Sequence, residues 1–455
     1  MLFDRRAFLS HAALAAAALG LPARAVAEIR RGRGGSTRPY LDLAVQCARW
    51  IDRSTQTTEH GLAWPADPLK PESVSLGFYN GMPGVVAFYA ALYAASGDSR
   101  GLDRARGGAD YLARRMSTSP EDVGAGLYLG LAGLGYTFDT VARAGGGERY
   151  GAHARQAASL LARTARQAEG GVEWSDVHDI VGGGAGTGLF LIEAGRSWND
   201  PSLMALAAKA GHRLIAAGVP AAGGRMWHMS DSRRVNMPNF SHGTSGVAYF
   251  LATLYRQTGE RAFLDAALEG VRYLDAIATR RDGAALIFHN EDGGQDRYYL
   301  SWCHGPGGTA RLFYQLNQIA PDRRWTGWID ALTKGVMISG IPEGLTTGYW
   351  NNISQCCGHI GVAQYCIDLI RYHRTDTANT FMKRLVDDTM RRAGRTEEAG
   401  LYWIQAENRT QPDNLVAQTG FMQGAAGVGT FFLQLDALER GEHWRFPQPD
   451  TPFAG

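Results

Sequence analysis

Three cysteines beside glycine-rich turns are the residues of this chain best suited to chemistry. Cys303 lies in SWCHG, and Cys356 and Cys357 lie in QCCGHIG. Thiolates select zinc over hard cations, and three protein ligands with an open fourth position are typical of catalytic zinc sites. The three cysteines therefore predict a site for Zn²⁺, with His304 and His359 as substitute ligands or as groups just outside the ligands.

The cysteine count leaves two other interpretations open. The chain has 5 cysteines, so at least one of them is unpaired. A disulfide between Cys303 and Cys356 would close a loop instead of binding a metal, and inert buried thiols would do neither. Cys47 and Cys366 lie in the apolar stretches LDLAVQCARWI and GVAQYCIDLI, and we predict that both are core residues.

A histidine and an aspartate stand in comparable places. His242 lies in SHGTSG, and Asp179 lies in HDIVG. His242 could cap a helix or lie in the core, but imidazole exchanges protons near neutral pH and this one stands beside a Gly-turn, so we predict a catalytic role. Asp179 is suited either to catalysis or to capping the helix that follows it, and the sequence favours neither role. His178 and His228 are weaker candidates.

Most of these residues lie next to copies of one short motif, Gly-x-x-Gly, which recurs seven times along the chain. One copy is weak evidence, but seven copies, most of them followed by an apolar run, indicate a repeat architecture. The copies begin at Gly81, Gly130, Gly183, Gly243, Gly305, Gly358 and Gly424.

Each repeat is predicted to be a helical hairpin. The stretch 84–95, GVVAFYAALYAA, is apolar on nearly all sides, as in a helix that is buried all round. The following stretch 98–116 alternates charged and apolar residues, as in an outer helix, and residues 258–274 repeat that pattern. The predicted fold is all-α, an α/α toroid in which seven inner helices form one barrel and seven outer helices surround it.

Closure of this ring would bring the Gly-turns together at one end. There the missing side chains permit backbones to approach closely, and the N-termini of the inner helices point free N–H groups into one basin. Residues far apart in sequence would meet in this basin. An open solenoid would instead need polar caps at its ends, and none stands out in the sequence.

Length and charge narrow the classes of function. With 455 residues, of which 45% are hydrophobic, the chain can bury a large core, and we predict that residues 39–455 form a single toroid domain. The net charge of +2 gives no field that would attract nucleic acid. We therefore expect no nucleic-acid partner, and we expect a monomer.

The N-terminus has the pattern of an export signal. Residues 1–27 contain DRRAFLS, then an Ala/Leu-rich run and small residues in ARA and AVA. We expect export by the twin-arginine route to the periplasm or the cell exterior, with residues 28–38 as a basic, glycine-containing linker. The apolar run is too short to span a bilayer, and no other segment reaches the roughly 20 apolar residues of a membrane span.

Taken together, the motifs resemble those of lanthionine synthetase C-like (LanC-like) proteins. The resemblance rests on the seven Gly-turns, HDIVG, SHGTSG, SWCHG and CCGHIG. It implies a seven-fold double α-barrel with a catalytic zinc at the Gly-turn end, held by Cys303, Cys356 and Cys357. The commoner family pattern has histidine at the last of these positions, and Cys-Cys-Gly is a variant of some lanthipeptide synthetases.

The resemblance also implies an activity. Family members add a peptide cysteine thiol to dehydroalanine or dehydrobutyrine, which forms a thioether, and His242 and Asp179 match the proposed acid/base positions. The partner is then a dehydrated peptide that carries a cysteine, or one that receives a small thiol. The family often has an arginine close before Trp-Cys. Here Arg297 lies farther upstream and Tyr299 is nearer, so no role for Arg297 follows.

Two other functions compete with this one. A non-catalytic toroid would use zinc for stability and bind peptides in its basin. An exported glycan-processing toroid would carry paired carboxylates at the turns. Only Asp179 is placed in this way, so the glycan-processing alternative is the weakest of the three.

Overall fold

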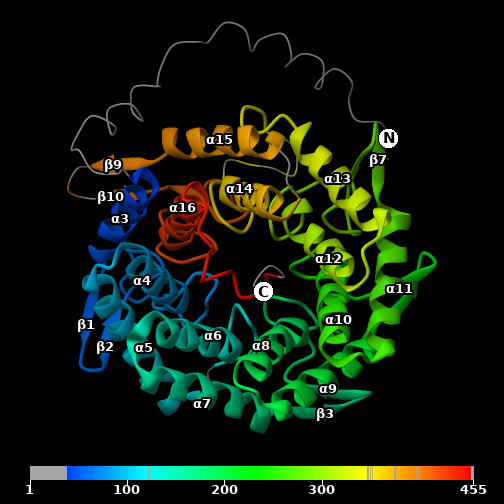
Figure 1. The fold of residues 1–455 in the computed structure, drawn as a ribbon, viewed down its shortest axis with the longest axis horizontal. Coiled ribbons are helices and arrows are strands. Elements are labelled where there is room, and N and C mark those ends of the chain that lie inside the picture. Colours follow the sequence, from blue (N-terminus) through cyan, green and yellow to red (C-terminus); the bar gives the residue numbers. More distant parts are fainter. Residues whose placement is uncertain are drawn as a thin grey trace, which may run out of the picture.

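The computed structural model describes residues 38–451, except residues 121–122, 346–347, 349, 351, 374–375, 397 and 399. The predicted export signal and nearly all of the predicted linker lie outside the described residues. Within them, the chain forms the predicted all-α toroid, a ring of helices two layers deep (Figure 1). No helix in this part of the chain combines the length and the apolarity that crossing a bilayer requires.

Seven inner helices form the inner barrel, and each begins directly after the first glycine of a Gly-x-x-Gly motif. They are buried on nearly all sides, which explains why their sequences carry apolar residues all round. The inner helices are α4 (Met82–Ser96), α6 (Leu131–Val141), α8 (Gly184–Ser197), α10 (Thr244–Thr258), α12 (Pro306–Ile319), α14 (His359–Asp368) and α16 (Ala425–Glu439).

Seven outer helices cover this barrel, and six of them follow their inner partner in the chain. The seventh, α3 (Pro39–Asp52), comes from the other end of the described chain and packs against α16. The last repeat is therefore not a continuous hairpin, and the pairing of α3 with α16 closes the ring (Figure 1). The other outer helices are α5 (Ser99–Thr118), α7 (Glu148–Thr164), α9 (Pro201–Ala217), α11 (Arg261–Ile277), α13 (Arg323–Met337) and α15 (Asp376–Arg391).

Capping residues turn the chain between an inner helix and its outer partner. The side chains of Asp98, Asp200 and Asp322 each accept a hydrogen bond from a backbone N–H in the first turn of the outer helix that follows. Gly97 and Gly259 adopt the left-handed conformation that ends α4 and α10. Two π-helical turns, η2 (Ala142–Gly146) and η3 (Leu369–His373), extend α6 and α14.

Short antiparallel hairpins follow five of the outer helices, and the sequence interpretation did not include them. Each packs against the next outer helix round the ring. In one of them, Asp282 and Gly283 have φ of 50° and 78°, as a two-residue type I′ turn requires. The hairpins are β1 (Gln56–Thr58) with β2 (Gly61–Ala63), β3 (Arg166–Ala168) with β4 (Gly171–Glu173), β5 (Val219–Ala221) with β6 (Gly224–Met226), β7 (Thr279–Arg281) with β8 (Ala284–Leu286), and β9 (Gly394–Thr396) with β10 (Gly400–Tyr402); a further pair, β11 (Gln405–Ala406) with β12 (Leu415–Val416), precedes the last Gly-turn.

A closed ring of backbone hydrogen bonds joins the seven loops that lead into the Gly-turns. In each step, a backbone N–H of one loop donates to a backbone carbonyl of the next loop, with N···O distances of 2.7–3.2 Å. Ile180 donates in place of its neighbour Val181. The carbonyls that accept lie two residues before the first glycine of each motif, on Tyr79, Tyr128, Val181, Ser241, Cys303, Cys356 and Met422.

Close approach explains why both glycines of the motif are needed. A Cβ atom at Gly243 would lie 1.6 Å from the carbonyl oxygen of Met237, and a Cβ atom at Gly427 would lie 1.8 Å from the carbonyl oxygen of Phe421. These separations are far inside contact distance. Any side chain at either position would push the inner helix away from the loop that enters it and would strain the backbone ring.

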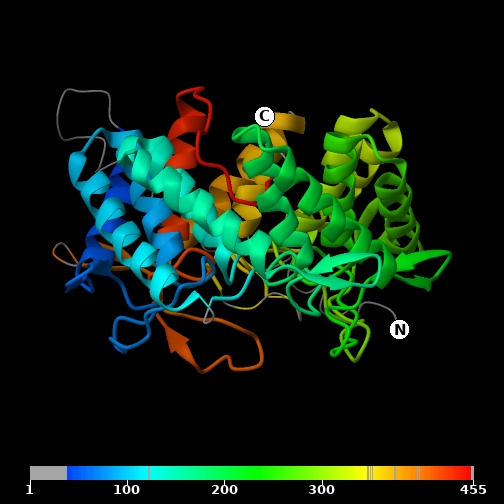
Figure 2. The same cartoon turned by 90° about the horizontal axis from the view of Figure 1, so that it is seen from below.

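After α16 the C-terminal segment 440–451 turns back into the interior of the inner barrel (Figure 1). It enters from the end opposite the Gly-turn loops (Figure 2). Trp444, Phe446, Gln448 and Asp450 of this segment are buried. The barrel is therefore filled by its own C-terminal segment, which we call the tail.

The interior of the barrel also holds Asp368, at the end of α14. Burial raises the pKa of Asp368 to about 7, against the opposing charge of Arg311 and the hydrogen bond donated by Gln364. Between the ordinary pKa of a carboxyl and about 7, the folded protein keeps a proton that the unfolded chain releases. The free energy of unfolding therefore falls as the pH rises through this range.

Asp368→Asn should stabilise the protein more at pH 8 than at pH 5, by about 3 kcal/mol. Asparagine keeps an acceptor for Gln364 but does not titrate. The variant therefore lacks the fall in the free energy of unfolding that the wild type shows as the pH rises. Urea unfolding at both pH values measures the difference, with Asp387→Asn on the exposed side of α15 as the control. An equal effect of Asp368→Asn at the two pH values would contradict the prediction.

Candidate functional site

The three cysteines predicted as metal ligands lie together at the Gly-turn end. Their sulfur atoms are all within 4.8 Å of one another, with 3.4 Å between Cys303 and Cys357 and 3.2 Å between Cys357 and Cys356. All three are buried. The five cysteines of the chain are free, so the alternative disulfide between Cys303 and Cys356 is not formed. Cys47 and Cys366 are core residues, as predicted.

The backbone ring holds these thiols in place. The N–H of Cys303 donates to the carbonyl of Cys356 at 3.1 Å, and the N–H of Cys356 donates to the carbonyl of Met422 at 3.0 Å. The N–H of Cys357 donates to the hydroxyl of Ser354 at 3.2 Å. Ring closure therefore brings Cys303 to the Cys356–Cys357 pair across the space between two repeats.

Hydrogen bonds among the thiols favour a thiolate at Cys356. Burial acts to raise the pKa of Cys356, but hydrogen bonds from the thiols of Cys303 and Cys357 and from the Tyr79 hydroxyl outweigh it and hold that pKa well below its usual range. Burial and the hydrogen bond to Cys356 raise the pKa of Cys303, whereas the hydrogen bonds to Cys303 and Cys356 raise the pKa of Cys357.

Tyr79 is a site residue that the sequence interpretation missed. It lies two residues before Gly81, which is the position that Cys303 and Cys356 hold in their own repeats. Its amide donor and carbonyl acceptor belong to the backbone ring, and its hydroxyl also accepts a hydrogen bond from Gln423 at 2.8 Å. A comparison of the same position in all seven repeats is the signal that could have found it.

His242 and Asp179 form a hydrogen-bonded pair, with 2.6 Å between Nδ1 of the imidazole and Oδ2 of the carboxylate. The other oxygen of Asp179 accepts hydrogen bonds from the N–H groups of Gly182 and Gly183 at 2.8 and 3.0 Å. Asp179 thus orients His242 and also caps the turn into α8, the two roles between which the sequence did not decide.

The charge of Asp179 sets the protonation of His242. Burial acts to lower the pKa of the imidazole, but the charge and the hydrogen bond of Asp179 outweigh it, and the pKa rises above its ordinary value. The negative charge of Cys356 adds to this effect. The His242 side chain is 26% exposed, so a molecule in the solvent can reach it.

His304 lies beside His242 in a cluster of rings. The centroids of these two rings are 5.6 Å apart, and the His289 ring lies 4.4 Å from that of His304. Burial, together with the charges of His289 and His242, holds the pKa of His304 well below its ordinary value, so this imidazole is neutral. His289 does not precede a Gly-turn, and no spacing in the sequence marks it.

The ring nitrogens of His359 bond to groups other than the three thiols, so its predicted role beside the ligands stays a prediction. Nδ1 of His359 bonds to the carbonyl of Asn352 at 2.9 Å, and its Nε2 lies 2.8 Å from the Asp388 carboxylate on α15. His359 follows the glycine and is the first residue of α14, so it packs against the helical layers. The thiols precede the glycine and lie on the loop.

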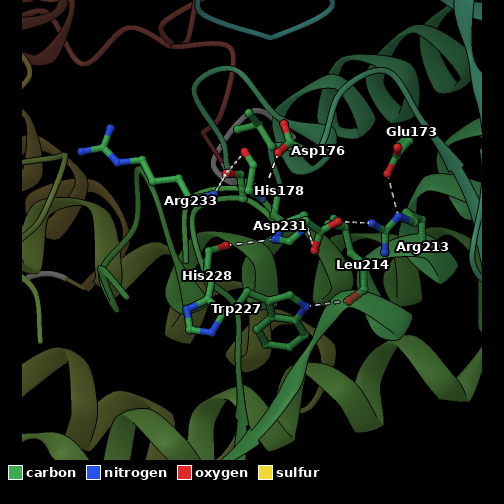
Figure 3. Close-up of polar contacts among 12 residues, drawn as sticks. Glu173, Asp176, His178, Arg213, Leu214, Trp227, His228, Asp231 and Arg233 are labelled. Carbon is green, nitrogen blue, oxygen red and sulfur yellow. Dashed lines mark hydrogen bonds and ion pairs between the residues drawn. The ribbon is translucent and has the colours of Figure 1, made fainter. Parts of the chain in front are cut away.

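The weaker candidates His178 and His228 belong to a polar network on the segments that lead into the third and fourth turns (Figure 3). Nδ1 of His178 bonds to the carbonyl of His228 at 3.0 Å, and its Nε2 lies 3.4 Å from the Asp231 carboxylate, which also binds Arg213. This network fixes the segment that directly precedes Asp179.

Arg297 and Tyr299 differ in their relation to the site. The carbonyl of Arg297 accepts a hydrogen bond from the N–H of His289 at 2.8 Å, and its guanidinium lies 3.9 Å from Asp296. The buried ring of Tyr299 lies 5.6 Å from that of His304. Tyr299, not Arg297, therefore packs against the residue next to Cys303.

The residues present fit a zinc ion. Zn–S bonds of about 2.3 Å in a tetrahedron place sulfur atoms about 3.8 Å apart, and the three sulfur atoms already lie near this spacing. Thiolates are a donor set that zinc prefers. Three ligands also leave a fourth position open, so Cys303, Cys356 and Cys357 could hold a zinc ion of the catalytic type.

The fold and the site define a class of protein: a closed α/α toroid with three thiols and an imidazole–carboxylate pair at its Gly-turn end. Residues 72–448 match the family model described as lanthionine synthetase C-like protein. The chain belongs to the lanthionine synthetase C-like family, which confirms the resemblance seen in its motifs. No curated protein sequence matches the chain.

Solved structures of different function share the toroid. Nisin cyclase aligns over 90% of this chain and 96% of its own, with a TM-score of 0.62 and 14% identity. An inactive variant of the α-1,6-mannanase of Salegentibacter sp. HEL1_6, in complex with α-1,6-mannotriose, aligns over 88% of this chain and 99% of its own, with a TM-score of 0.50 and 14% identity. These structural similarities establish the fold. They do not identify the reaction, which has to be inferred from the residues of the site.

Tyr79→Phe should raise the pKa of Cys356 in metal-free protein, because it removes one of the three hydrogen bonds that stabilise the thiolate. Ultraviolet titration of thiolate absorbance should show the first ionisation at a higher pH than in the wild type. Tyr89→Phe is the control, since it also removes a buried tyrosine hydroxyl, but one that bonds to Ala48 and Asp52. An unchanged first ionisation in Tyr79→Phe would contradict the prediction.

Proposed function

We propose that this protein is a zinc-dependent enzyme that adds a thiol to a dehydroalanine or dehydrobutyrine residue of a peptide and so forms a thioether. The observation that carries the proposal is the group of three buried thiols, Cys303, Cys356 and Cys357, at the same end of the toroid as the His242–Asp179 pair. Membership of the lanthionine synthetase C-like family supports it.

Each part of the site has a task in this reaction. The three cysteines would hold Zn²⁺, which when bound supplies the Lewis acidity that keeps an attacking thiol deprotonated near neutral pH. Asp179 fixes Nδ1 of His242, which leaves Nε2 for the reactant. The raised pKa of His242 extends to higher pH the range in which the imidazole is protonated, which favours its action as a general acid.

The bonds and protons balance without an oxidant or a reductant. The sulfur of the thiol forms a bond to the β-carbon of the dehydro residue, and the π electron pair moves onto the α-carbon and its carbonyl as an enolate. Nε2 of His242 gives a proton to the α-carbon. The proton that the thiol lost returns to the imidazole through solvent, so the net change is addition of S–H across the double bond.

The two other functions have less support. A glycan-processing enzyme would need paired carboxylates, but the carboxylate of Asp179 is taken up by His242 and two backbone N–H groups. A non-catalytic, zinc-stabilised peptide-binding toroid would not need an oriented imidazole beside the thiols. We also propose that the protein acts as a monomer after twin-arginine export to the periplasm or the cell exterior, on the pattern of residues 1–27.

Purified protein should contain about one zinc ion, and Cys303→Ala, Cys356→Ala and Cys357→Ala should each lose it together with activity. The probe is a synthetic peptide with one dehydroalanine and one cysteine, and cyclisation is read as loss of a thiol that can be alkylated. Cys366→Ala removes a buried thiol of α14 and should keep both zinc and activity. Zinc retained with no thioether formed would favour the peptide-binding alternative.

Asp179→Asn should move the alkaline limb of the pH–rate profile to lower pH. Asparagine keeps an acceptor for Gly182 and Gly183 but loses the charge that raises the pKa of His242, so the imidazole loses its proton earlier as the pH rises. His242→Asn should lower the rate about 10²- to 10⁴-fold. A rate profile that Asp179→Asn leaves unchanged would show that His242 is not the acid.

A further inference from the structure

The tail that fills the barrel ends on a buried ion pair. Asp450 and Arg311 of α12 are 1% and 3% exposed, and their charged groups lie 2.5 Å apart. A second guanidinium nitrogen of Arg311 donates to the side chain of Gln448 at 2.5 Å. Because both charges are almost fully buried, breaking the pair would leave an uncompensated charge inside the protein. The Asp450 carboxylate is therefore held beside Arg311 in the barrel.

The Asp450 carboxylate also contacts Trp302, the residue that directly precedes Cys303. Oδ2 of Asp450 accepts a hydrogen bond from the indole N–H of Trp302 at 2.7 Å. Trp302 is itself 1% exposed, and it packs against Tyr128 at 5.0 Å and Phe240 at 5.9 Å between ring centroids. A buried indole with its only donor engaged has one orientation.

Trp302 directly precedes Cys303, and the two side chains have different partners. The indole of Trp302 points into the barrel toward Asp450, whereas the sulfur of Cys303 points to Cys357, 3.4 Å away. The amide of Cys303 is fixed by the carbonyl of Cys356. With the amide and the preceding side chain both held, the backbone of Cys303 is fixed, and only rotation about its Cα–Cβ bond can move the sulfur away from the other thiols.

We propose that Asp450 is a positioning residue for the metal centre: by holding the indole of Trp302 from inside the barrel, it fixes the Cys303 sulfur against those of Cys356 and Cys357. The inference rests on the proposed zinc site and adds to it a requirement for the docked tail. Groups that orient metal ligands from outside the ligand set typically contribute about 10- to 100-fold to metal affinity.

The test compares two variants of the full chain that each remove one hydrogen bond to the tail. Trp302→Phe removes the donor to Asp450, and Tyr136→Phe removes the donor to the carbonyl of Pro447. Zinc affinity is measured by competition with a chelating indicator, and the ligand geometry is read from the thiolate-to-metal absorption of the Co²⁺-substituted protein.

Trp302→Phe should weaken zinc binding about tenfold or more and alter the Co²⁺ spectrum, while Tyr136→Phe should leave both unchanged. If Trp302→Phe does not fold, the double variant Arg311→Met with Asp450→Leu carries the same test. It replaces the buried pair by apolar side chains, which proteins tolerate, and it should show the same loss.

Wild-type affinity and an unchanged Co²⁺ spectrum in Trp302→Phe, or in the double variant, would overturn the inference while leaving the zinc site intact. Equal losses in Trp302→Phe and Tyr136→Phe would also overturn it, because they would show a general effect of tail stability. A wild-type protein that binds no zinc would overturn the proposed function itself, and this inference with it.

Discussion

The backbone ring that joins the seven Gly-turn loops is the constraint on which the rest of the structure depends. Each of its hydrogen bonds links the main chain of one repeat to that of the next, so the ring sets the relative positions of the repeats without help from side chains. It forms only if each inner helix approaches its loop more closely than a Cβ atom would allow, which is why the motif keeps its glycines. The pairing of α3 with α16 closes the outer layer of helices, just as the hydrogen bonds close the backbone ring.

Because the ring consists of main-chain hydrogen bonds, it does not restrict the type of the neighbouring side chains. Seven similar repeats can therefore carry different residues and form an asymmetric site. The residues directly before the seven first glycines share no chemical property: they are Asn80, Leu129, Gly182, His242, His304, Cys357 and Gln423. In three consecutive repeats this residue is His242, His304 or Cys357. Asp179, from the repeat before these three, bonds to His242. Exchange of Cys357 for the commoner histidine would change the ligand set while every hydrogen bond of the ring remained.

The parts of this arrangement that could be predicted from the sequence are those with local signals. Seven Gly-x-x-Gly copies were enough to predict a toroid, and the toroid was enough to bring Cys303 to Cys356 and Cys357. The pairing of α3 with α16 spans the whole chain, and no short pattern marks it. The sequence did not show that His359 begins α14 or that its ring bonds to Asn352 and Asp388. Tyr79 and Asp450 act through contacts across the ring and the barrel, which only a folded chain shows.

The site is built on loops, which position functional groups less precisely than helices or strands do. Here the loops are fixed from two sides. The backbone ring holds the amides and carbonyls of Cys303 and Cys356. Aromatic side chains next to the ring pack against one another, with Phe78 against Phe421 at 4.9 Å and Phe240 against Trp302 at 5.9 Å between ring centroids. A loop held in this way keeps its thiols in place without secondary structure of its own. The cost is that the site depends on whatever fills the barrel, and in this chain that is the tail.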